Sequence, residues 1–288
     1  MNLKLLTLNT HSLHGDESEI KRKMKDICEF LADERPNIVA MQEINQCASA
    51  SYADTDHTEG YYRAATCECP VPLKKGNFAV ELAWNMCRRG VAYHFTYLPV
   101  KRGYGIFDEG LAVFSLSPIR SSCGFYISRG DDFSDHNTRM AQLVEIKESD
   151  LIVCNLHTSR YDHDPDPFYD QWKRLRKRLP QKNNMFIMGD LNCPAEVRGE
   201  GYDRVCESGF FDSYRIADQR LGGVETTEEL IDGWKDGVRC GRIDYVFTSF
   251  YPMAQSIVYS RVFDGERGEK VSDHFGVMVE YKGLEVER

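Results

Sequence analysis

Asp190 and Asn192 are the two residues whose types and spacing most directly suggest chemistry. They close an apolar stretch, residues 186–192, that is typical of a buried strand. Because side chains alternate along an extended chain, the two polar groups would point to the same side, and Gly189 allows the backbone to turn or to approach another group closely. A carboxylate beside an amide can orient a water molecule. A strand that leads into an ordinary Asp/Asn turn would carry the same residues, so this pattern alone leaves both interpretations open.

Polar residues stand at other predicted strand ends as well. Taken singly, each has a structural explanation, such as a cap, a surface acid or a hydrogen-bonded core histidine. Asp244 is the hardest to explain in this way, because it lies between Ile243 and Tyr245 and a buried acid needs a partner. Taken together, these residues indicate one site gathered over the rim of a sheet. The further members of the set are Asn9, Glu43, His157, Asp273 and His274.

The chemistry that suits this set is the hydrolysis of a phosphate ester. Glu43 and Asn9 offer hard oxygen ligands to Mg²⁺ or Mn²⁺, and Mg²⁺ typically takes only one or two carboxylates together with waters and substrate oxygens. Asp190 can orient or deprotonate the attacking water, which Asn192 helps to hold. These residues therefore predict a hydrolase that depends on a divalent metal and uses water as its nucleophile.

The histidines fit the same reaction. His157 and His274 can donate hydrogen bonds to the phosphoryl oxygens as negative charge builds there. Asp244 and Asp273 can orient these histidines or reach the metal through water. The sequence has no G-x-S-x-G elbow for a covalent serine nucleophile and no H-E-x-x-H or cysteine-rich zinc pattern.

Alternating strand and helix patterns must position these side chains. A strand over 3–8 is followed by a helix signal at Asp16, by apolar residues at helical spacing as far as Leu31, and by a strand over 38–41. Polar, irregular stretches are expected at 45–76 and 218–241. Helices are expected near 78–88, from 166 to 179 and at 200–208. Further strands are expected at 92–97, 110–116, 123–128, 139–147, 151–155, 242–247, 256–262 and 275–281. This pattern predicts one mixed α/β domain over residues 1–288, with two packed sheets and outer helices.

Length, charge and cysteine usage narrow the class of protein. The 288 residues are ample for a full core, and no apolar run is long enough for a transmembrane helix or a secretory signal. Ten cysteines are scattered without a C-x-x-C pair, so we expect a reduced, cytoplasmic protein. The net charge of -9 argues against an affinity based on neutralising many nucleic-acid phosphates. The basic cluster at 173–178 is interpreted as the solvated face of a helix.

Seven short segments resemble, in order, motifs of the endonuclease/exonuclease/phosphatase superfamily, which includes pancreatic-type DNases, abasic-site nucleases, neutral sphingomyelinases and inositol-phosphate phosphatases. These segments span nearly the whole chain and are residues 7–9, 42–43, 109–115, 155–157, 189–192, 242–245 and 272–274. The resemblance implies a four-layer α/β/β/α sandwich, with two packed mixed β-sheets flanked by helices and the site at one edge. It implies that Glu43 is the metal-ligand glutamate and that Asn9 is its neighbour. It implies that Asp190 and Asn192 hold the nucleophilic water. It also implies that His157 and His274 stabilise the phosphate and that Asp244 supports His274.

A narrower resemblance points to the Gram-positive branch that contains maltose 6'-phosphate phosphatases. It lies in residues 9–12, 137–139, 166–168, 231–234 and 271–277. Residues 158–161 depart from that branch, which tends to carry Gly and Trp there, so the identity of the sugar stays open. Arg139 is either a phosphate clamp, through its guanidinium fork, or half of a structural ion pair. Trp234 either stacks on a sugar face or anchors its loop.

The sequence therefore predicts a cytoplasmic, Mg²⁺-dependent phosphomonoesterase that acts on a small sugar phosphate, with no membrane or nucleic-acid partner. The alternative enzyme is a phosphodiesterase, either a nuclease or a sphingomyelinase-like protein. A third possibility is a catalytically inactive binding module on the same fold, against which the full set of polar residues speaks.

Overall fold

The computed structural model describes the whole chain except residues 56–57, 70, 148, 182–183, 229–240 and 286–288. The helices of the described chain are α1 (Glu17–Glu34), α2 (Phe78–Arg88), α3 (Phe168–Arg178), α4 (Gly201–Glu207) and α5 (Ser213–Ile216). The first seven strands are β1 (Leu3–Asn9), β2 (Ile38–Cys47), β3 (Thr66–Cys67), β4 (His94–Gly103), β5 (Phe107–Ser115), β6 (Ile119–Tyr126) and β7 (Met140–Ile146). The remaining strands are β8 (Ile152–His157), β9 (Met185–Asp190), β10 (Phe211–Asp212), β11 (Gln219–Leu221), β12 (Asp244–Thr248), β13 (Ser256–Val262) and β14 (Gly276–Lys282).

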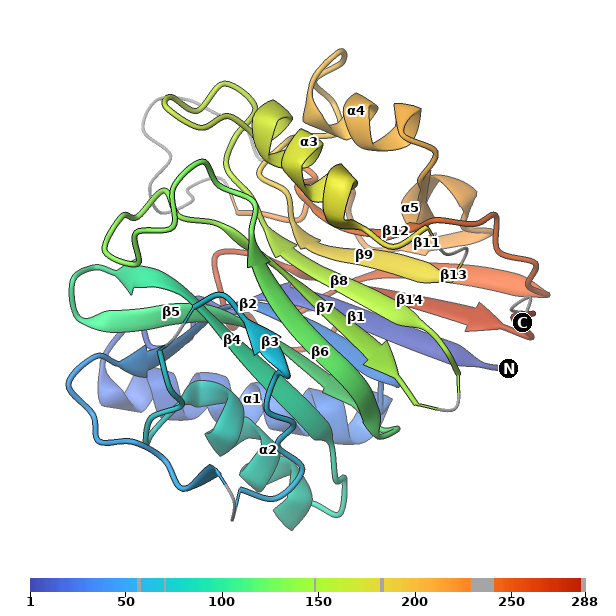
Figure 1. Cartoon of the computed structure of the whole chain (residues 1–288). Coiled ribbons are helices and arrows are strands. Elements are labelled where there is room, and N and C mark those ends of the chain that lie inside the picture. The colour runs from blue at the N-terminus through green and yellow to red at the C-terminus, as the bar shows by residue number, and fades with distance from the viewer. Residues whose placement is uncertain (56–57, 70, 148, 182–183, 229–240, 286–288) are drawn as a thin grey trace.

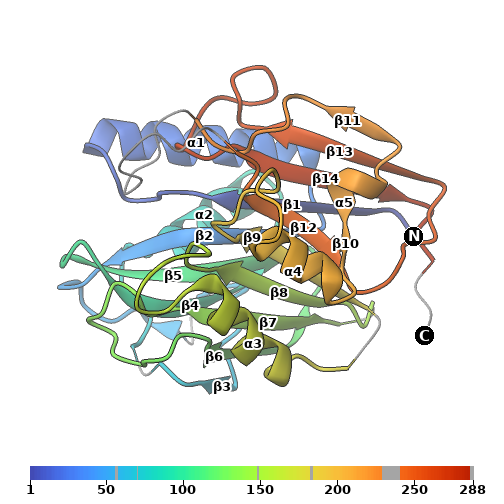
Figure 2. The ribbon, with the colours of Figure 1, turned by 90° about the horizontal axis from the view of Figure 1, so that it is seen from above.

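The strands form two seven-stranded mixed sheets. The first has the order β11-β13-β14-β1-β2-β5-β4 and the second the order β10-β12-β9-β8-β7-β6-β3. Helices α1 and α2 cover the outer face of the first sheet, and α3 and α4 cover the outer face of the second (Figures 1 and 2). This is the four-layer α/β/β/α sandwich that the sequence predicted.

Alternating side chains explain why the sheets stack. In β1, Leu6 and Leu8 pack in the core beneath α1 and α2, whereas Leu3 and Leu5 pack between the two sheets. This division follows from the period of two along a strand. A third apolar cluster joins the outer face of the second sheet to α3 and α4 and includes Trp172. Each sheet therefore buries both faces, which accounts for the nearly continuous apolar strands.

Side-chain caps begin the first two helices at the expected places. Asp16 accepts hydrogen bonds from the backbone N–H groups of Ser18 and Glu19, and the Glu19 side chain accepts from the Asp16 N–H, which completes a capping box. The Asn77 side chain caps α2 by accepting a hydrogen bond from the backbone N–H of Ala79. The sequence predicted the Asp16 signal and a helix near 78–88.

The hairpin of β4 and β5 differs from the sequence expectation. β4 does not end near residue 97 but continues to Gly103 and pairs with β5 from its first residue, Phe107. The polar residues 101–103 gave no strand pattern, yet cross-strand ion pairs of Lys101 with Glu109 and of Arg102 with Asp108 hold this end of the hairpin. The extension carries charged side chains to the edge of the sandwich where the predicted site lies.

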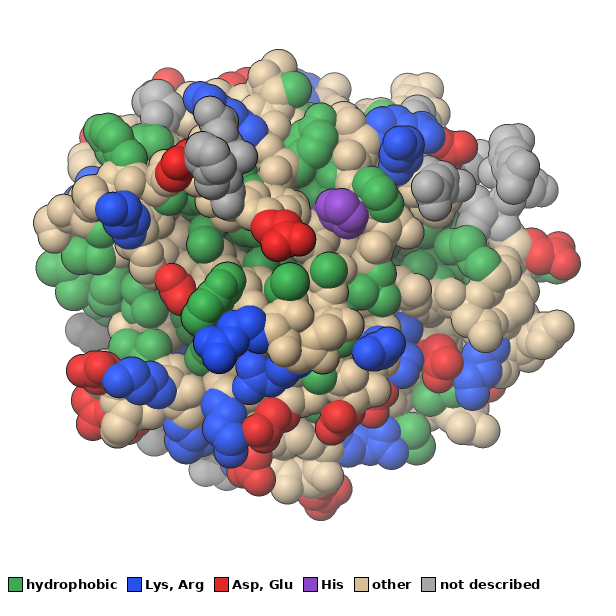
Figure 3. Space-filling model, turned by 90° about the horizontal axis from the view of Figure 1, so that it is seen from below, with side chains coloured by type: hydrophobic (Ala, Val, Ile, Leu, Met, Phe, Trp, Pro, Cys, Tyr) green, Lys and Arg blue, Asp and Glu red, His purple; other side chains and the backbone are tan. Residues whose placement is uncertain are grey.

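The face over α1 and α2 is shown in Figure 3, where basic and acidic side chains are interspersed with hydrophobic ones.

Nine cysteines in the described chain are free thiols. None of the described helices is both long and apolar enough to cross a membrane.

Candidate active site

The site lies where several strands of both sheets end. β8 and β9 are parallel, so His157 and Asp190 lie side by side at their last positions. β12 runs antiparallel to β9 and begins with Asp244, directly opposite Asp190. Asn9 ends β1 in the other sheet, and its side-chain Nδ2 donates to Asp190 Oδ2 at 3.2 Å. The structure thus brings predicted residues from distant parts of the chain into contact.

Gly189 makes the approach of β8 to β9 possible. Its φ of 137° lies outside the range that side chains favour, and a Cβ atom there would lie 2.0 Å from the carbonyl oxygen of Leu156. The backbone of β9 can therefore run against β8 and present Asp190 at the sheet edge.

Asn192 is placed differently from the sequence expectation. The backbone does not stay extended after Asp190, because Asn192 has a φ of 51° in the left-handed region. Its backbone N–H donates to Asp190 Oδ1 at 2.8 Å, and its Nδ2 donates to the carbonyl oxygen of Thr158 at 2.9 Å. Buried Leu191 points into the core beneath α3, so the chain turns immediately after it. Asn192 still lines the same cavity as Asp190.

Glu43 lies in the middle of a strand, not at the end that the sequence indicated. β2 continues to Cys47, and a β-bulge between Met41 and Ile44 gives Glu43 a φ of 52°. Bulges re-aim side chains near functional sites. The carbonyl oxygen of Glu43 accepts hydrogen bonds from the hydroxyl of Ser12 at 2.8 Å and from that of Thr10 at 3.3 Å, so the loop after β1 fixes the bulge.

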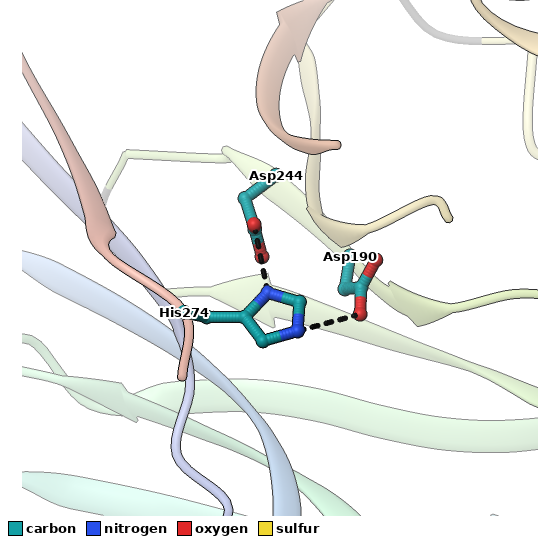
Figure 4. A group of neighbouring side chains, drawn as sticks. All are labelled: Asp190, Asp244 and His274. Atoms are coloured by element: carbon teal, nitrogen blue, oxygen red, sulfur yellow. Dashed lines mark hydrogen bonds and ion pairs between the residues drawn. The ribbon is translucent and has the colours of Figure 1, made fainter. Parts of the chain in front are cut away.

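His274 lies between two carboxylates (Figure 4). Its Nδ1 is 2.9 Å from Asp244 Oδ2 and its Nε2 is 3.8 Å from Asp190 Oδ2. All three residues are buried. Burial opposes the charged ring, but the Asp244 and Asp190 carboxylates outweigh it and raise the pKa of His274 to about 10. The ring is therefore an imidazolium at neutral pH, held by Asp244 with Nε2 directed at Asp190.

His157 has the opposite electrostatic environment. Its Nε2 lies 3.6 Å from Asp190 Oδ2, yet burial, and then the nearby positive charge of Arg139, hold the pKa of His157 well below its usual range. The Asp190 carboxylate therefore faces two histidines of different charge, the neutral ring of His157 and the imidazolium of His274. Two histidines whose pKa values are shifted in opposite directions are typical of sites that carry out acid–base chemistry.

The carboxylates fit a divalent cation. Glu43 accepts from Asn9 Nδ2 at 2.9 Å, and burial together with the neighbouring Glu109 raises the pKa of Glu43; burial also raises that of Asp190. Carboxyl oxygens whose negative charge is disfavoured until a cation compensates it suit Mg²⁺ or Mn²⁺, which prefer hard oxygen ligands. Asp273, the other predicted ligand, lies 3.6 Å from His11 Nδ1 and adds negative charge near Glu43.

Asp190, Asp244 and His274 form a second group whose ligand atoms lie within 4.8 Å of one another. His274 Nδ1 is hydrogen-bonded to Asp244 Oδ2 at 2.9 Å, which engages one of the possible ligand atoms of this group. Glu43 with Asn9 and this buried group are therefore both candidates to hold a divalent ion.

Arg139 reaches the site, whereas Trp234 falls outside the described residues. Arg139 Nη1 donates to the carbonyl oxygens of His136 and Thr138 at 2.7 and 3.0 Å. In the part of the chain that the structure describes, no carboxylate lies within ion-pair distance of Arg139, which disfavours the structural ion pair.

Sequence reasoning gave no role to several residues of the cavity, which has a volume of about 460 Å³. Lys101 and Tyr104 come from the end of β4 and the turn after it, and Glu109 comes from β5. Glu109 begins one of the segments that resemble the family, and this resemblance was the signal that could have identified it as a site residue. Lys101 lies directly after a register shift of β4 that begins at Pro99, and nothing in the local sequence pattern marks Lys101 as a site residue.

The chain belongs to the endonuclease/exonuclease/phosphatase family, whose model matches residues 6–274. The chain has no match among curated proteins. Its fold is similar to that of an endonuclease/exonuclease/phosphatase family protein from Leptotrichia buccalis, with a TM-score of 0.79, 22% identity, and 99% of this chain and 100% of that chain covered. It is also similar to the mannosyl-6-phosphatase Bt3783 of Bacteroides thetaiotaomicron (TM-score 0.60, 18% identity, 99% and 100% covered) and to TDP2 from Caenorhabditis elegans (0.58, 15%, 98% and 74%).

Proposed function

We propose that the chain is a divalent-metal-dependent phosphoric ester hydrolase that removes phosphate from a small phosphorylated molecule of the sugar-phosphate class. The observation that carries this proposal is the environment of Asp190, a buried carboxylate flanked by His157 at 3.6 Å and His274 at 3.8 Å. A base next to two hydrogen-bond donors suits attack by water on a phosphoryl group.

Each residue has a distinct role in this proposal. Asp190 orients the attacking water and accepts its proton, with Asn192 holding the Asp190 carboxylate through its backbone N–H. His274 donates from Nε2 to a phosphoryl oxygen, and Asp244 keeps it protonated. His157 donates to a second oxygen as a neutral ring. Glu43 and Asn9 hold Mg²⁺ or Mn²⁺, which supplies Lewis-acid stabilisation when it is bound.

The cavity and the overall charge favour a small substrate. The site lines a cleft of about 460 Å³, and the net charge of -9 opposes binding that depends on many nucleic-acid phosphates. The similarity of the fold to a mannosyl-6-phosphatase is compatible with this substrate class.

Tyr104 offers a face for the leaving group. It follows β4, is 61% exposed, and lines the cavity. Its ring packs edge-on against His14 with 4.4 Å between the ring centroids, so its orientation is supported. Aromatic rings that are apolar and held in place suit the C–H face of a sugar.

The test is a comparison of substrates at equal enzyme and Mg²⁺ concentrations. Phosphate release is measured from a panel of hexose and disaccharide phosphates, and nicking is measured on plasmid and abasic DNA. We expect at least one sugar phosphate to be hydrolysed and DNA to remain intact. Efficient cutting of DNA with every sugar phosphate inert would replace this proposal with the nuclease alternative.

A further inference from the structure

Two positively charged side chains converge on one backbone carbonyl at the cavity wall. Lys101 Nζ donates to the carbonyl oxygen of His136 at 3.2 Å, and Arg139 Nη1 donates to the same oxygen at 2.7 Å. Lys101 comes from β4 in the first sheet, whereas Arg139 directly precedes β7 in the second. The shared acceptor therefore joins the two sheets and holds an ammonium and a guanidinium close together.

The positive charge of this pair is only partly compensated. Glu109 Oε1 lies 3.2 Å from Lys101 Nζ, and among the described residues it is the one carboxylate within ion-pair distance of either cation. Arg139 Nε is buried and has no hydrogen-bond acceptor in the described chain. A buried donor without an acceptor is costly, and an anion that enters the cavity would supply one.

The pair faces the reaction centre. Lys101 and Arg139 line the same cavity as Asp190, His157 and His274. The negative charges that act most strongly on Arg139 are those of Glu109, Asp190 and Glu43. The two cations therefore share one cavity with the groups that would act on the phosphoryl group of a substrate.

We propose that Lys101 and Arg139 form a clamp for the terminal phosphoryl oxygens that makes the enzyme select phosphomonoesters over phosphodiesters. This inference rests on the proposed function and adds the discrimination between ester classes. A monoester carries a charge of about -1.5 to -2 at pH 7 and has three terminal oxygens, whereas a diester is a monoanion with two. The two charged donors should bind the monoester more tightly than the diester, because charge-assisted hydrogen bonds strengthen with the charge of the acceptor.

The experiment compares p-nitrophenyl phosphate with bis-p-nitrophenyl phosphate in the metal-loaded enzyme. For Lys101→Met and for Arg139→Met, we expect the ratio of kcat/KM for monoester to that for diester to fall by about tenfold or more, which corresponds to about 1.4 kcal/mol. Lys101→Arg keeps the charge and should restore much of the ratio. Lys173→Met is the matched control, since it removes one positive charge from an exposed position of α3 and should leave the ratio unchanged.

A second measurement needs no variant and covers the case in which a variant does not fold. In the wild-type enzyme, methyl phosphate should inhibit at least about tenfold more tightly than dimethyl phosphate. Equal inhibition by methyl and dimethyl phosphate would overturn the clamp, and so would variants that lower kcat/KM for both p-nitrophenyl esters by the same factor. Either result would leave the proposed hydrolysis itself intact. Absence of hydrolysis of any phosphate ester would instead contradict the proposed function.

Discussion

Asp190 and Asp244 are direct cross-strand neighbours on β9 and β12, and their carboxylates face opposite nitrogens of one imidazole ring. Like charges directly opposite each other destabilise a sheet. The ring of His274 compensates them, since it carries a positive charge and lies 2.9 Å from one carboxylate and 3.8 Å from the other. The pairing of the strands and the protonation of His274 are thus two aspects of one arrangement, which joins the fold to the chemistry.

Asp190 and His274 should therefore behave as one catalytic unit. Asp190→Asn and His274→Gln are each expected to lower kcat by about three orders of magnitude, because each removes a group that acts on the same phosphoryl transfer. The double variant should be within about tenfold of the slower single variant. The measurement is metal-dependent release of p-nitrophenol, with circular dichroism to establish that each variant is folded. Losses that multiply independently would show that the two residues do not act together.

Glu43 should be the protein ligand on which divalent-metal binding depends most. In the wild type, Mg²⁺ or Mn²⁺ at about 100 times its dissociation constant should raise Tm by about 5–10 °C, because binding at this level adds about 2.7 kcal/mol of stability. Glu43→Gln should abolish most of the shift, since an amide replaces a charged ligand. The control is Glu17→Gln, at an exposed position of α1. An unchanged shift in Glu43→Gln would move the metal to other ligands.

The sequence predicted most of the long elements and the polar residues that meet at the sheet edge. Helix α2 has the expected bounds because Asn77 is a strong cap and the apolar spacing is regular. The smallest elements were missed. β10 and β11 have two and three residues, which is too short for a periodic pattern. Their pairing depends instead on β12 and β13, which are distant in the chain.

The sequence predicted which residues meet at the site better than it predicted how the backbone places them. The bulge that places Glu43 depends on hydroxyl groups of the loop after β1, and a single-sequence pattern does not encode that contact. Lys101 lies in a polar run and becomes part of the site only because β4 and the segment before β7 meet at the carbonyl of His136. Residues whose role arises from tertiary contact leave no local signal.

Gly189 should tolerate no side chain. A Cβ atom there would lie 2.0 Å from the carbonyl oxygen of Leu156, and the φ of 137° adds backbone strain. Gly189→Ala is expected to lower the free energy of unfolding by about 4 kcal/mol or more, or to prevent folding. Gly130→Ala is the control, because that position has open space and no left-handed backbone. Urea denaturation of both proteins is the measurement. A difference below about 1 kcal/mol between them would show that β8 and β9 can separate without cost.

Asp264 should give the fold a component of stability that is lost in acid. Its Oδ1 accepts from the backbone N–H groups of Glu266 and Arg267 at 3.1 and 2.9 Å, and its Oδ2 accepts from Arg261 Nε at 3.0 Å. Burial opposes ionisation, but these donors outweigh it and hold the pKa of Asp264 below its ordinary value of 3.8. A carboxylate with a depressed pKa stabilises the fold above the pKa of the unfolded chain, and this contribution disappears as pH falls through the folded pKa.

Asp264→Asn removes that charge and should reduce the free energy of unfolding by about 1.5–3 kcal/mol at pH 7, the usual value of hydrogen bonds to a charged group. The difference between wild type and variant should shrink progressively below about pH 4, where the wild-type carboxyl takes up its proton. Urea denaturation at pH 7, 5 and 3 measures it, with Asp131→Asn, at an exposed position, as the control for the loss of one negative charge. A difference that stays constant from pH 7 to pH 3 would mean that the Asp264 side chain acts through its shape and not through its charge.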